Sequence, residues 1–271
     1  MEKLASYWST DKTLPDSYVL PPGERPGDTS VPPCKIPIVD LSKVAGHDRA
    51  NAIEQIMQAA VKFGFFQVIN HGIRKELLKD AMSVFTEFFE LPFKDKSHLY
   101  SEELNENCRL YTSSYNYARE EIHYWRDCLK HNCRLGSRIL DLICEGLGLE
   151  PGYFANGLSG EAFLVVNHYP PCPDPSLTLG LPKHCDPNLI TLLLQGNVPG
   201  LQVFVDGECL LVEPCPDAFV VNIGYQFQVI SNGMMRSVEH RVVTNAETAR
   251  TTAALFIKPS KNAILNLQKL L

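Results

Sequence analysis

Two patterns of apolar and polar positions divide this chain. Up to about residue 147, apolar residues recur every three or four positions in the segments 48–63, 74–90 and 135–147, which predicts amphipathic helices. From Phe163 onward, short apolar runs alternate with turn sequences, which predicts strands joined by hairpins. These runs are Phe163–Val166, Leu189–Leu194, Leu201–Val205, Leu210–Val212, Phe219–Ile223, Val242–Thr244 and Thr252–Ile257. The sequence therefore predicts a mixed α and β protein whose second half is a β-sandwich or barrel.

Two further strands are predicted in the first half. Ile36–Leu41 is short, whereas Phe63–Gly72 is rich in aromatic and β-branched residues and ends at a turn. We interpret His71, which lies in this turn, as a residue that bonds the backbone rather than as a metal ligand.

The remaining segments of the first half leave alternatives open. Residues 1–35 are polar and rich in proline, which is typical of an extended arm on the surface or of a disordered tail. Segment 108–129 predicts strands that carry several tyrosines. Tyr111 and Tyr124 are candidates for the wall of a substrate pocket, although packing within the strands explains them equally well.

Composition and charge narrow the class of protein. The chain has 271 residues, a size that allows one or two domains, and its net charge of −6 comes without a long basic run. A general nucleic-acid surface would require clustered positive charge, so we expect no nucleic-acid partner. The nine cysteines are irregularly spaced and form no C-x-x-C pair, which argues against a disulfide framework or a zinc knuckle.

Free thiols of this kind fit a reducing compartment. Met1–Lys12 has no apolar segment of the kind found in secretory signals, and the longest apolar runs are too short to cross a bilayer. We therefore expect a cytoplasmic protein without a membrane partner.

The candidate chemistry lies within residues 181–252. His184 and Asp186 are two positions apart, so in an extended segment both side chains point to the same face. His240 follows several predicted strands and could be brought beside them by a folded sheet. Two histidines and one carboxylate on one face of a metal are typical of non-haem iron(II) sites with open positions. The alternatives are a simple turn at Asp186-Pro187-Asn188 and a structural histidine at 240.

The order of these motifs resembles a known family. Asn167-His168-Tyr169-Pro170-Pro171-Cys172-Pro173, the H-x-D pair, His240 and Arg250-x-Thr252 are similar to the plant 2-oxoglutarate- and iron(II)-dependent dioxygenases. Within that family, the chain resembles the branch that includes hyoscyamine 6-hydroxylase and flavonoid dioxygenases. The resemblance runs from Pro37 to about Pro259. It implies a double-stranded β-helix, or jelly roll, with flanking helices. It also implies two regions: an N-terminal dioxygenase region at 1–130, and a shortened jelly-roll domain at 131–271.

The resemblance also implies a reaction and a set of site residues. His184, Asp186 and His240 would bind Fe(II), and iron is preferred to zinc because this ligand set leaves positions open. The co-substrates would be 2-oxoglutarate and O2. Arg250 offers a planar guanidinium for the distal carboxylate of 2-oxoglutarate, and Thr252 lies on the same face of its strand. Tyr169 and Asn167 would also hold the co-substrate, and Phe256, Tyr111 and Tyr124 are candidates for the substrate pocket.

The implied activity is oxidative decarboxylation of 2-oxoglutarate coupled to hydroxylation or desaturation of a small metabolite such as a flavonoid or an alkaloid. The family is often monomeric, so we expect a monomer. Two departures stand out: relatives carry a further helical segment after Lys130, and many have Asp where this chain has Tyr225. The alternative hypotheses are a shortened, catalytically impaired relative that binds metal or ligand without turnover, and a cupin-like zinc protein or hydrolase.

Overall fold

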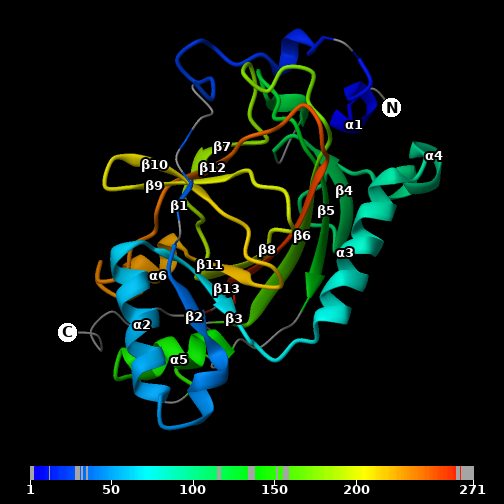
Figure 1. Ribbon diagram of the computed structural model, residues 1–271. Helices are drawn as coiled ribbons and strands as arrows, with labels where there is room; N and C mark the ends of the chain where they lie inside the picture. The colour runs from blue at the N-terminus through cyan, green and yellow to red at the C-terminus, as the bar shows by residue number, and fades with distance from the viewer. Residues whose placement is uncertain are drawn as a thin grey trace.

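Two β-sheets face one another and form the centre of the molecule (Figure 1). The computed structural model describes residues 3–11, 13–27, 31, 33–34, 36–114, 117–133, 138–150, 152–154, 159–260 and 263. Within these residues, one sheet has five strands in the order β1-β10-β9-β12-β7, and the other has eight in the order β2-β3-β11-β8-β13-β6-β5-β4. The predicted jelly roll with flanking helices is therefore confirmed.

The predicted helices and most predicted strands are present with small shifts at their ends. Within segment 108–129, however, only Cys108–Thr112 and the residues from Asp127 onward are strands, and the strand predicted at Val242–Thr244 lies at His240–Val242. The strands are β1 (Pro33–Cys34), β2 (Ile38–Asp40), β3 (Phe65–Ile69), β4 (Cys108–Thr112), β5 (Asp127–Cys133), β6 (Glu161–Tyr169), β7 (Leu181–His184), β8 (Ile190–Leu194), β9 (Leu201–Val205), β10 (Glu208–Val212), β11 (Phe219–Ile223), β12 (His240–Val242) and β13 (Arg250–Lys258). The helices are α1 (Ala5–Trp8), α2 (Arg49–Lys62), α3 (Lys75–Glu90), α4 (Phe93–Lys96), α5 (Arg138–Gly146) and α6 (Tyr225–Ile230). Short 3-10 helices lie at Asp16–Tyr18, Leu41–Ala45, Ser97–Leu99 and Tyr117–Arg119.

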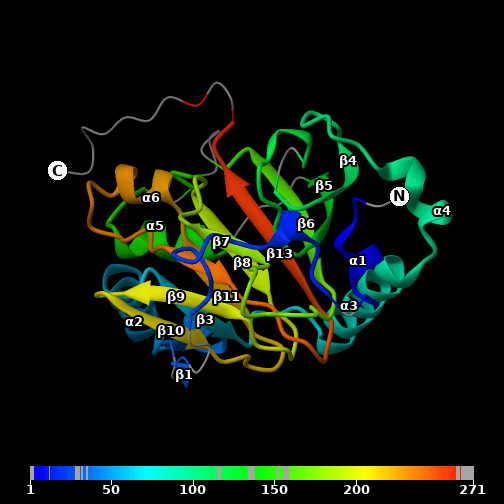
Figure 2. The same cartoon turned by 90° about the horizontal axis from the view of Figure 1, so that it is seen from above.

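The longer helices cover the outside of the sheets (Figures 1 and 2). α2 and α5 share one apolar cluster with β2, β3 and β11, and α3 lies along the outer face of β6 and β13. The apolar stripe of α3 is narrower than the sequence pattern predicts. Leu78 packs against Leu194 and Ala253, whereas Leu77 and Val84 are 54% and 60% exposed. The sheet contacts one side of this helix, and the adjacent positions on the helix surface stay exposed to solvent.

The described parts of the N-terminal arm pack on the sheets rather than forming a free tail. Tyr18 and Leu20 are buried, and the carboxylate of the fully buried Asp127 accepts hydrogen bonds from the backbone N–H groups of Ala5 and Ser6. Burial raises the pKa of Asp127, while these hydrogen bonds oppose the rise. The arm is thereby bound to the start of β5.

Two smaller expectations about chemistry are confirmed by the fold. His71 bonds the backbone, because its Nε2 lies 2.9 Å from the carbonyl oxygen of Asp217 and its Nδ1 accepts the N–H of Ile73. The cysteines of the described segments for which a state is assigned are free thiols. No helix in the described segments is long and apolar enough to cross a membrane.

Candidate active site

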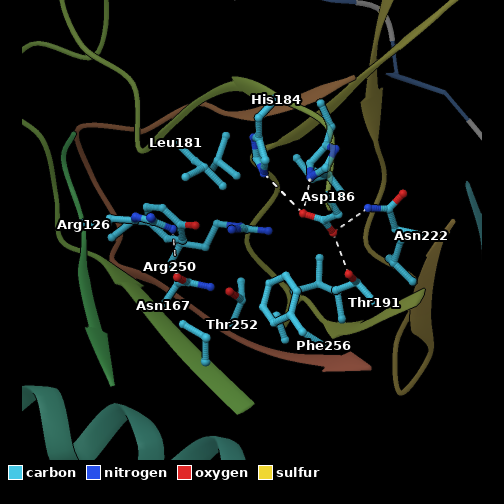
Figure 3. Close-up of a pocket in the computed structure, with 18 of the residues that line it drawn as sticks. Arg126, Asn167, Leu181, His184, Asp186, Thr191, Asn222, Arg250, Thr252 and Phe256 are labelled. Atoms are coloured by element: carbon cyan, nitrogen blue, oxygen red, sulfur yellow. Dashed lines mark hydrogen bonds and ion pairs between the residues drawn. The ribbon is translucent and has the colours of Figure 1, made fainter. Parts of the chain in front are cut away.

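The three predicted metal ligands meet because two strands of the smaller sheet pair directly. β7 ends at His184 and β12 begins at His240, and these two residues are partners in the ladder between the strands. Asp186 follows β7 by two positions. One ligand atom from each residue lies within 4.8 Å of the others, and Figure 3 shows the side chains of His184 and Asp186 pointing toward one another. His184 Nε2 is 3.4 Å and His240 Nε2 is 3.7 Å from Asp186 Oδ1.

Backbone contacts set which nitrogen of each imidazole can bind a metal. The Nδ1 atom of His184 lies 2.8 Å from the carbonyl oxygen of Pro182, and that of His240 lies 3.2 Å from the carbonyl oxygen of Val238. A carbonyl can only accept, so each Nδ1 carries the proton and each Nε2 keeps a lone pair toward the other ligands. Burial lowers the pKa of His240 to about 4, which leaves this imidazole neutral and able to ligate at neutral pH.

Hydrogen bonds hold the carboxylate of Asp186 in one orientation. Thr191 Oγ1 and Asn222 Nδ2 donate to Asp186 Oδ2 at 2.6 and 2.7 Å, which leaves Oδ1 facing the two histidines (Figure 3). Burial would raise the pKa of Asp186, but His240, His184 and the Thr191 hydroxyl outweigh it, so the pKa is lowered. The carboxylate is therefore ionised and presents one oxygen to a metal, as the two-histidine, one-carboxylate set requires.

A cavity of about 80 Å³, here called the inner chamber, joins the metal ligands to the predicted co-substrate residues. Arg250 lies in its wall and is 2% exposed. Its Nε donates to the carbonyl oxygen of Val198 at 3.0 Å, but its Nη2 is buried with no hydrogen-bond partner among the described residues. Burial lowers the pKa of Arg250. A buried guanidinium with an unpaired N–H group requires an anion, and the distal carboxylate of 2-oxoglutarate fits this requirement.

Glycine at position 200 makes room for this arginine. A Cβ atom there would lie 3.1 Å from Arg250 Cδ and equally close to the carbonyl oxygen of Val243. The Pro199-Gly200 sequence, which predicts a turn, therefore also allows the backbone to approach the Arg250 side chain closely.

The other predicted co-substrate residues lie beside Arg250 on the neighbouring strand. Register between β13 and β6 places Arg250 opposite Tyr169 and Thr252 opposite Asn167, and all four line the inner chamber. Burial raises the pKa of Tyr169, although the positive charges of Arg126 and Arg250 oppose the rise. Tyr169, Thr252 and Asn167 therefore place hydrogen-bonding groups in the same part of the chamber wall as Arg250.

Sequence reasoning missed three polar residues that line the inner chamber. Thr191 and Asn222 orient Asp186, and Arg126 donates from Nη1 to Asn167 Oδ1 at 3.1 Å and from Nε to the carbonyl oxygen of Ser113. Thr191 and Asn222 were within predicted strands, but alternation alone does not say which inward-facing residue meets a ligand. Arg126 lies just before β5 and no motif in the sequence marked it.

A second cavity of about 520 Å³, here called the outer cleft, adjoins the inner chamber at two of the metal ligands. It shares Arg126, Leu181, His184, Asp186 and Phe256 with the inner chamber. Its other lining residues are Ser114, Phe163, Pro182, Cys185, Pro187, Asn188, Gln226 and Lys258. A molecule in the outer cleft could therefore approach His184 and Asp186, whereas Arg250 does not line this cavity.

The three candidates for the substrate wall have different positions. Phe256 lines both cavities, and Tyr111 lines the inner chamber alone. Tyr124 lines neither of these two cavities, and its backbone N–H donates to Ser113 Oγ at 2.8 Å. Tyr225, which stands where many relatives are expected to have Asp, is 55% exposed and also lines neither cavity.

Comparison with known proteins agrees with this geometry. Residues 160–259 match the model of the 2OG-Fe(II) oxygenase superfamily, and residues 36–141 match that of the non-haem dioxygenase in morphine synthesis N-terminal region. The chain is 41% identical to Protein DOWNY MILDEW RESISTANCE 6 of Arabidopsis thaliana, across 97% of this chain and 86% of that protein. The chain belongs to the 2OG-Fe(II) oxygenase superfamily. It is an enzyme whose cofactor is Fe(II) and whose co-substrates are 2-oxoglutarate and O2.

Two further relatives belong to the branch that the sequence motifs indicated. Flavanone 3-dioxygenase 2 of Oryza sativa subsp. japonica is 41% identical over 93% of this chain and 82% of its own length. Hyoscyamine 6-dioxygenase of Hyoscyamus niger is 38% identical over 96% of this chain and 85% of its own length. Among solved structures, JOX2 in complex with 2OG, Fe and JA superposes with a TM-score of 0.81 at 32% identity, covering 99% of this chain and 87% of JOX2.

These comparisons bear on the two alternative hypotheses. Because the chain belongs to the 2OG-Fe(II) oxygenase superfamily, the alternative of a cupin-like zinc protein or hydrolase is wrong. The alignment with the Arabidopsis protein spans 296 positions, more than the 271 residues of this chain, so the relative has residues that this chain lacks. The described residues nevertheless bring together the three metal ligands and Arg250, and nothing in them supports the impaired alternative.

Proposed function

We propose that this enzyme hydroxylates or desaturates a small specialised metabolite in a reaction coupled to the oxidative decarboxylation of 2-oxoglutarate. The named activities of its relatives, which include a flavanone dioxygenase and a hyoscyamine dioxygenase, support a flavonoid- or alkaloid-like substrate. The observation that carries the proposal is the inner chamber, which connects the metal ligands to the unpaired N–H group of Arg250.

Each residue of the site has a defined part in this proposal. His184, Asp186 and His240 hold Fe(II) on one side and leave the other positions open. Arg250 pairs with the distal carboxylate of 2-oxoglutarate. The hydrogen-bonding groups of Thr252, Asn167 and Tyr169 surround that co-substrate. Together, the bound iron and 2-oxoglutarate activate dioxygen and supply the oxidant that removes hydrogen from the substrate.

We propose that the two cavities receive different reactants. Most polar side chains in the wall of the inner chamber are buried, among them Asn167, Arg250 and Thr252, and this burial would limit the access of bulk water to the co-substrate. The larger outer cleft receives the substrate, with Phe256 as part of its wall. Tyr111 reaches only the inner chamber, so its contact would be with the co-substrate side of the site.

The proposal extends to the setting of the enzyme. The net charge of −6 and the absence of a long basic run favour a small-molecule partner over nucleic acid, and the free cysteines favour the cytoplasm. We expect a monomer. The division into residues 1–130 and residues 131–271 stays a prediction.

The experiment that tests the proposal is an anaerobic titration of the purified protein with Fe(II) and then with 2-oxoglutarate. The iron chelate of a 2-oxo acid has a weak visible charge-transfer band, and we expect this band to saturate at one equivalent of iron. Release of succinate under air then measures turnover. If iron binds but the band does not form with saturating 2-oxoglutarate, the inner chamber does not hold the co-substrate and the proposal is wrong.

A further inference from the structure

Two aromatic rings stack on the eight-stranded sheet, near the C-terminal end of β13 and the start of β6. Phe256 of β13 lies opposite Phe163 of β6, and their rings stack at a centroid distance of 4.9 Å. Two lysines approach the Phe163 ring: Lys130 Nζ lies 5.3 Å and Lys258 Nζ lies 5.6 Å from its centroid. Phe256 also lines the inner chamber, so the stack extends from the metal site to the pair of lysines.

The positive charges at this place have few negative partners. Register between β4 and β5 puts Lys130 directly opposite Arg109, and like charges in that position destabilise a sheet. Among the described residues, neither side chain has an ion pair with a carboxylate. Lys130 Nζ donates to the carbonyl oxygen of Leu104 at 3.3 Å, and Arg109 Nη1 donates to that of Ser101 at 3.2 Å.

Burial adds to the cost of these charges. Arg109 is fully buried, and its Nε has no hydrogen-bond partner among the described residues. Burial lowers the pKa of Lys130, and the positive charges of Arg109 and Lys258 lower it further. Among the described residues at this place, Glu161 supplies a carboxylate, which pairs with Lys258 at 3.1 Å. A bound anion would relieve the repulsion between these cations.

The space for such an anion is present. A cavity of about 890 Å³, here called the lysine groove, is lined by Lys130, Lys258, Phe163 and Glu161 together with Leu104, Asn105, Asn107, His131, Asn132, Gly160 and Ala162. It shares Phe163 and Lys258 with the outer cleft. Lys258 follows Phe256 by two residues on β13, a rise of about 7 Å along the strand. One small molecule could therefore contact Phe256 and Lys258 together.

We propose that the substrate is an amphipathic organic acid whose apolar body lies on the Phe256–Phe163 stack and whose carboxylate binds between Lys130 and Lys258. This inference rests on the proposed function and adds the charge class of its substrate. The stack would place the apolar part beside the metal, and the lysines would hold the anionic end away from it. Arg109 acts as a positioning residue that adds positive potential behind Lys130.

The test uses a panel of aromatic and alicyclic monocarboxylic acids, cinnamic acid first, each matched with its own methyl ester. Binding is measured anaerobically as the shift of the charge-transfer band of the protein loaded with Fe(II) and 2-oxoglutarate. Calorimetry on the metal-free protein gives an independent affinity. We expect at least one acid to bind about tenfold or more tightly than its ester, because an ester cannot form charge-assisted hydrogen bonds with the lysines.

Variants localise the preference. Lys130→Met and Lys258→Met should each reduce the preference for acid over ester by about tenfold, the effect of losing one charged hydrogen bond. Lys62→Met is the matched control, because Lys62 Nζ also lies over an aromatic ring, that of Phe63 at 5.3 Å, but on α2. Glu161→Gln should change affinity in the opposite direction: it frees Lys258 and should tighten acid binding severalfold.

The outcomes separate this inference from the proposed function. If no acid in the panel binds more tightly than its own ester, or if both lysine variants keep the wild-type preference, the anion site is wrong and the lysine groove is only open space beside β5. If the charge-transfer band fails to form in the wild type while calorimetry shows the acid preference, the proposed function fails and the anion site stands. A lysine variant that does not fold is replaced by Glu161→Gln, whose gain in affinity a folding defect cannot imitate.

Discussion

The inner chamber and the outer cleft share the metal ligands but are built in different ways. Much of the inner chamber is walled by residues of β6, β8, β11 and β13, which lie inside the eight-stranded sheet with a strand on either side, and the rest of its wall includes residues of β3, β4, β7, β9 and β12. The outer cleft is bounded by the segment that follows β7 and by the ends of β6 and β13. The backbone of a central strand is hydrogen-bonded to a neighbouring strand on each side, which fixes the positions of its side chains. At the ends of strands, the side chains can vary more in length and charge.

Polar groups follow the same division. In the inner chamber, Asp186 and Asn167 are buried, and each accepts a hydrogen bond from a neighbouring side chain, while Arg250 keeps one N–H group unpaired among the described residues. At the outer end, Lys130 and Lys258 are only partly buried and lie over an aromatic ring. This difference supports our proposal that the inner chamber holds the co-substrate and that the outer cleft receives the substrate.

The largest expected effect comes from removing a ligand. His240→Ala should abolish stoichiometric binding of Fe(II) and all substrate-dependent succinate release, because two remaining ligands hold the metal far more weakly. His71→Ala is the control, since His71 bonds only backbone groups. Iron content after gel filtration measures both variants. Full iron occupancy in His240→Ala would exclude this residue as a ligand.

The next effect concerns the co-substrate end of the inner chamber. Arg250→Ala should raise the 2-oxoglutarate concentration needed for half-saturation by roughly 100-fold or more, because a buried carboxylate would lose its charged partner. Iron affinity should be unchanged. Arg241→Ala removes the same charge nearby, but Arg241 pairs with Gln202 and with the carbonyl oxygen of Pro26, so its effect on 2-oxoglutarate should be small. Equal effects of the two variants would contradict the role of Arg250.

A smaller effect is expected from the residues that orient Asp186. Asn222→Leu and Thr191→Val should each weaken iron binding by about 10- to 100-fold, the usual cost of losing a hydrogen bond to a metal ligand. Competition with a coloured chelator measures this affinity. Asn222→Asp is a sharper variant, because a second carboxylate beside Asp186 Oδ2 would repel it. Iron affinity unchanged in all three variants would mean that Asp186 is held by other contacts.

The smallest effect should separate the substrate wall from its surroundings. Phe256→Ala removes half of the aromatic stack and should raise the substrate KM by about tenfold while 2-oxoglutarate affinity holds. Tyr124→Phe should change neither constant by more than about twofold, because Tyr124 lines neither the inner chamber nor the outer cleft, and surface changes usually have small effects. A large loss in Tyr124→Phe alone would move the substrate wall toward β5.

Much of the fold could be predicted from patterning because helices and strands here carry clear periods. β9 and β11 begin and end where the sequence predicts. α6 was missed, since Tyr225-Gln226-Phe227-Gln228 alternates apolar and polar residues as a strand would. Its start is set by the tertiary structure: the N–H of Tyr225 donates to the carbonyl oxygen of Asp186 at 2.7 Å, and a Cβ on Gly224 would collide with the carbonyl oxygen of Asn188.

The sequence by itself determined the kind of chemistry, because residue types and their order along the chain limit which metal and which co-substrate can bind. His184 and Asp186, then His240, then Arg250 were recognisable without coordinates. Only the tertiary structure decided which other side chains join them. Register between strands far apart in the sequence brings Asn222 to Asp186 and Lys130 beside Phe163. A linear pattern carries no information on that register, so the orientation of the ligands and the charge of the outer end had to come from the fold.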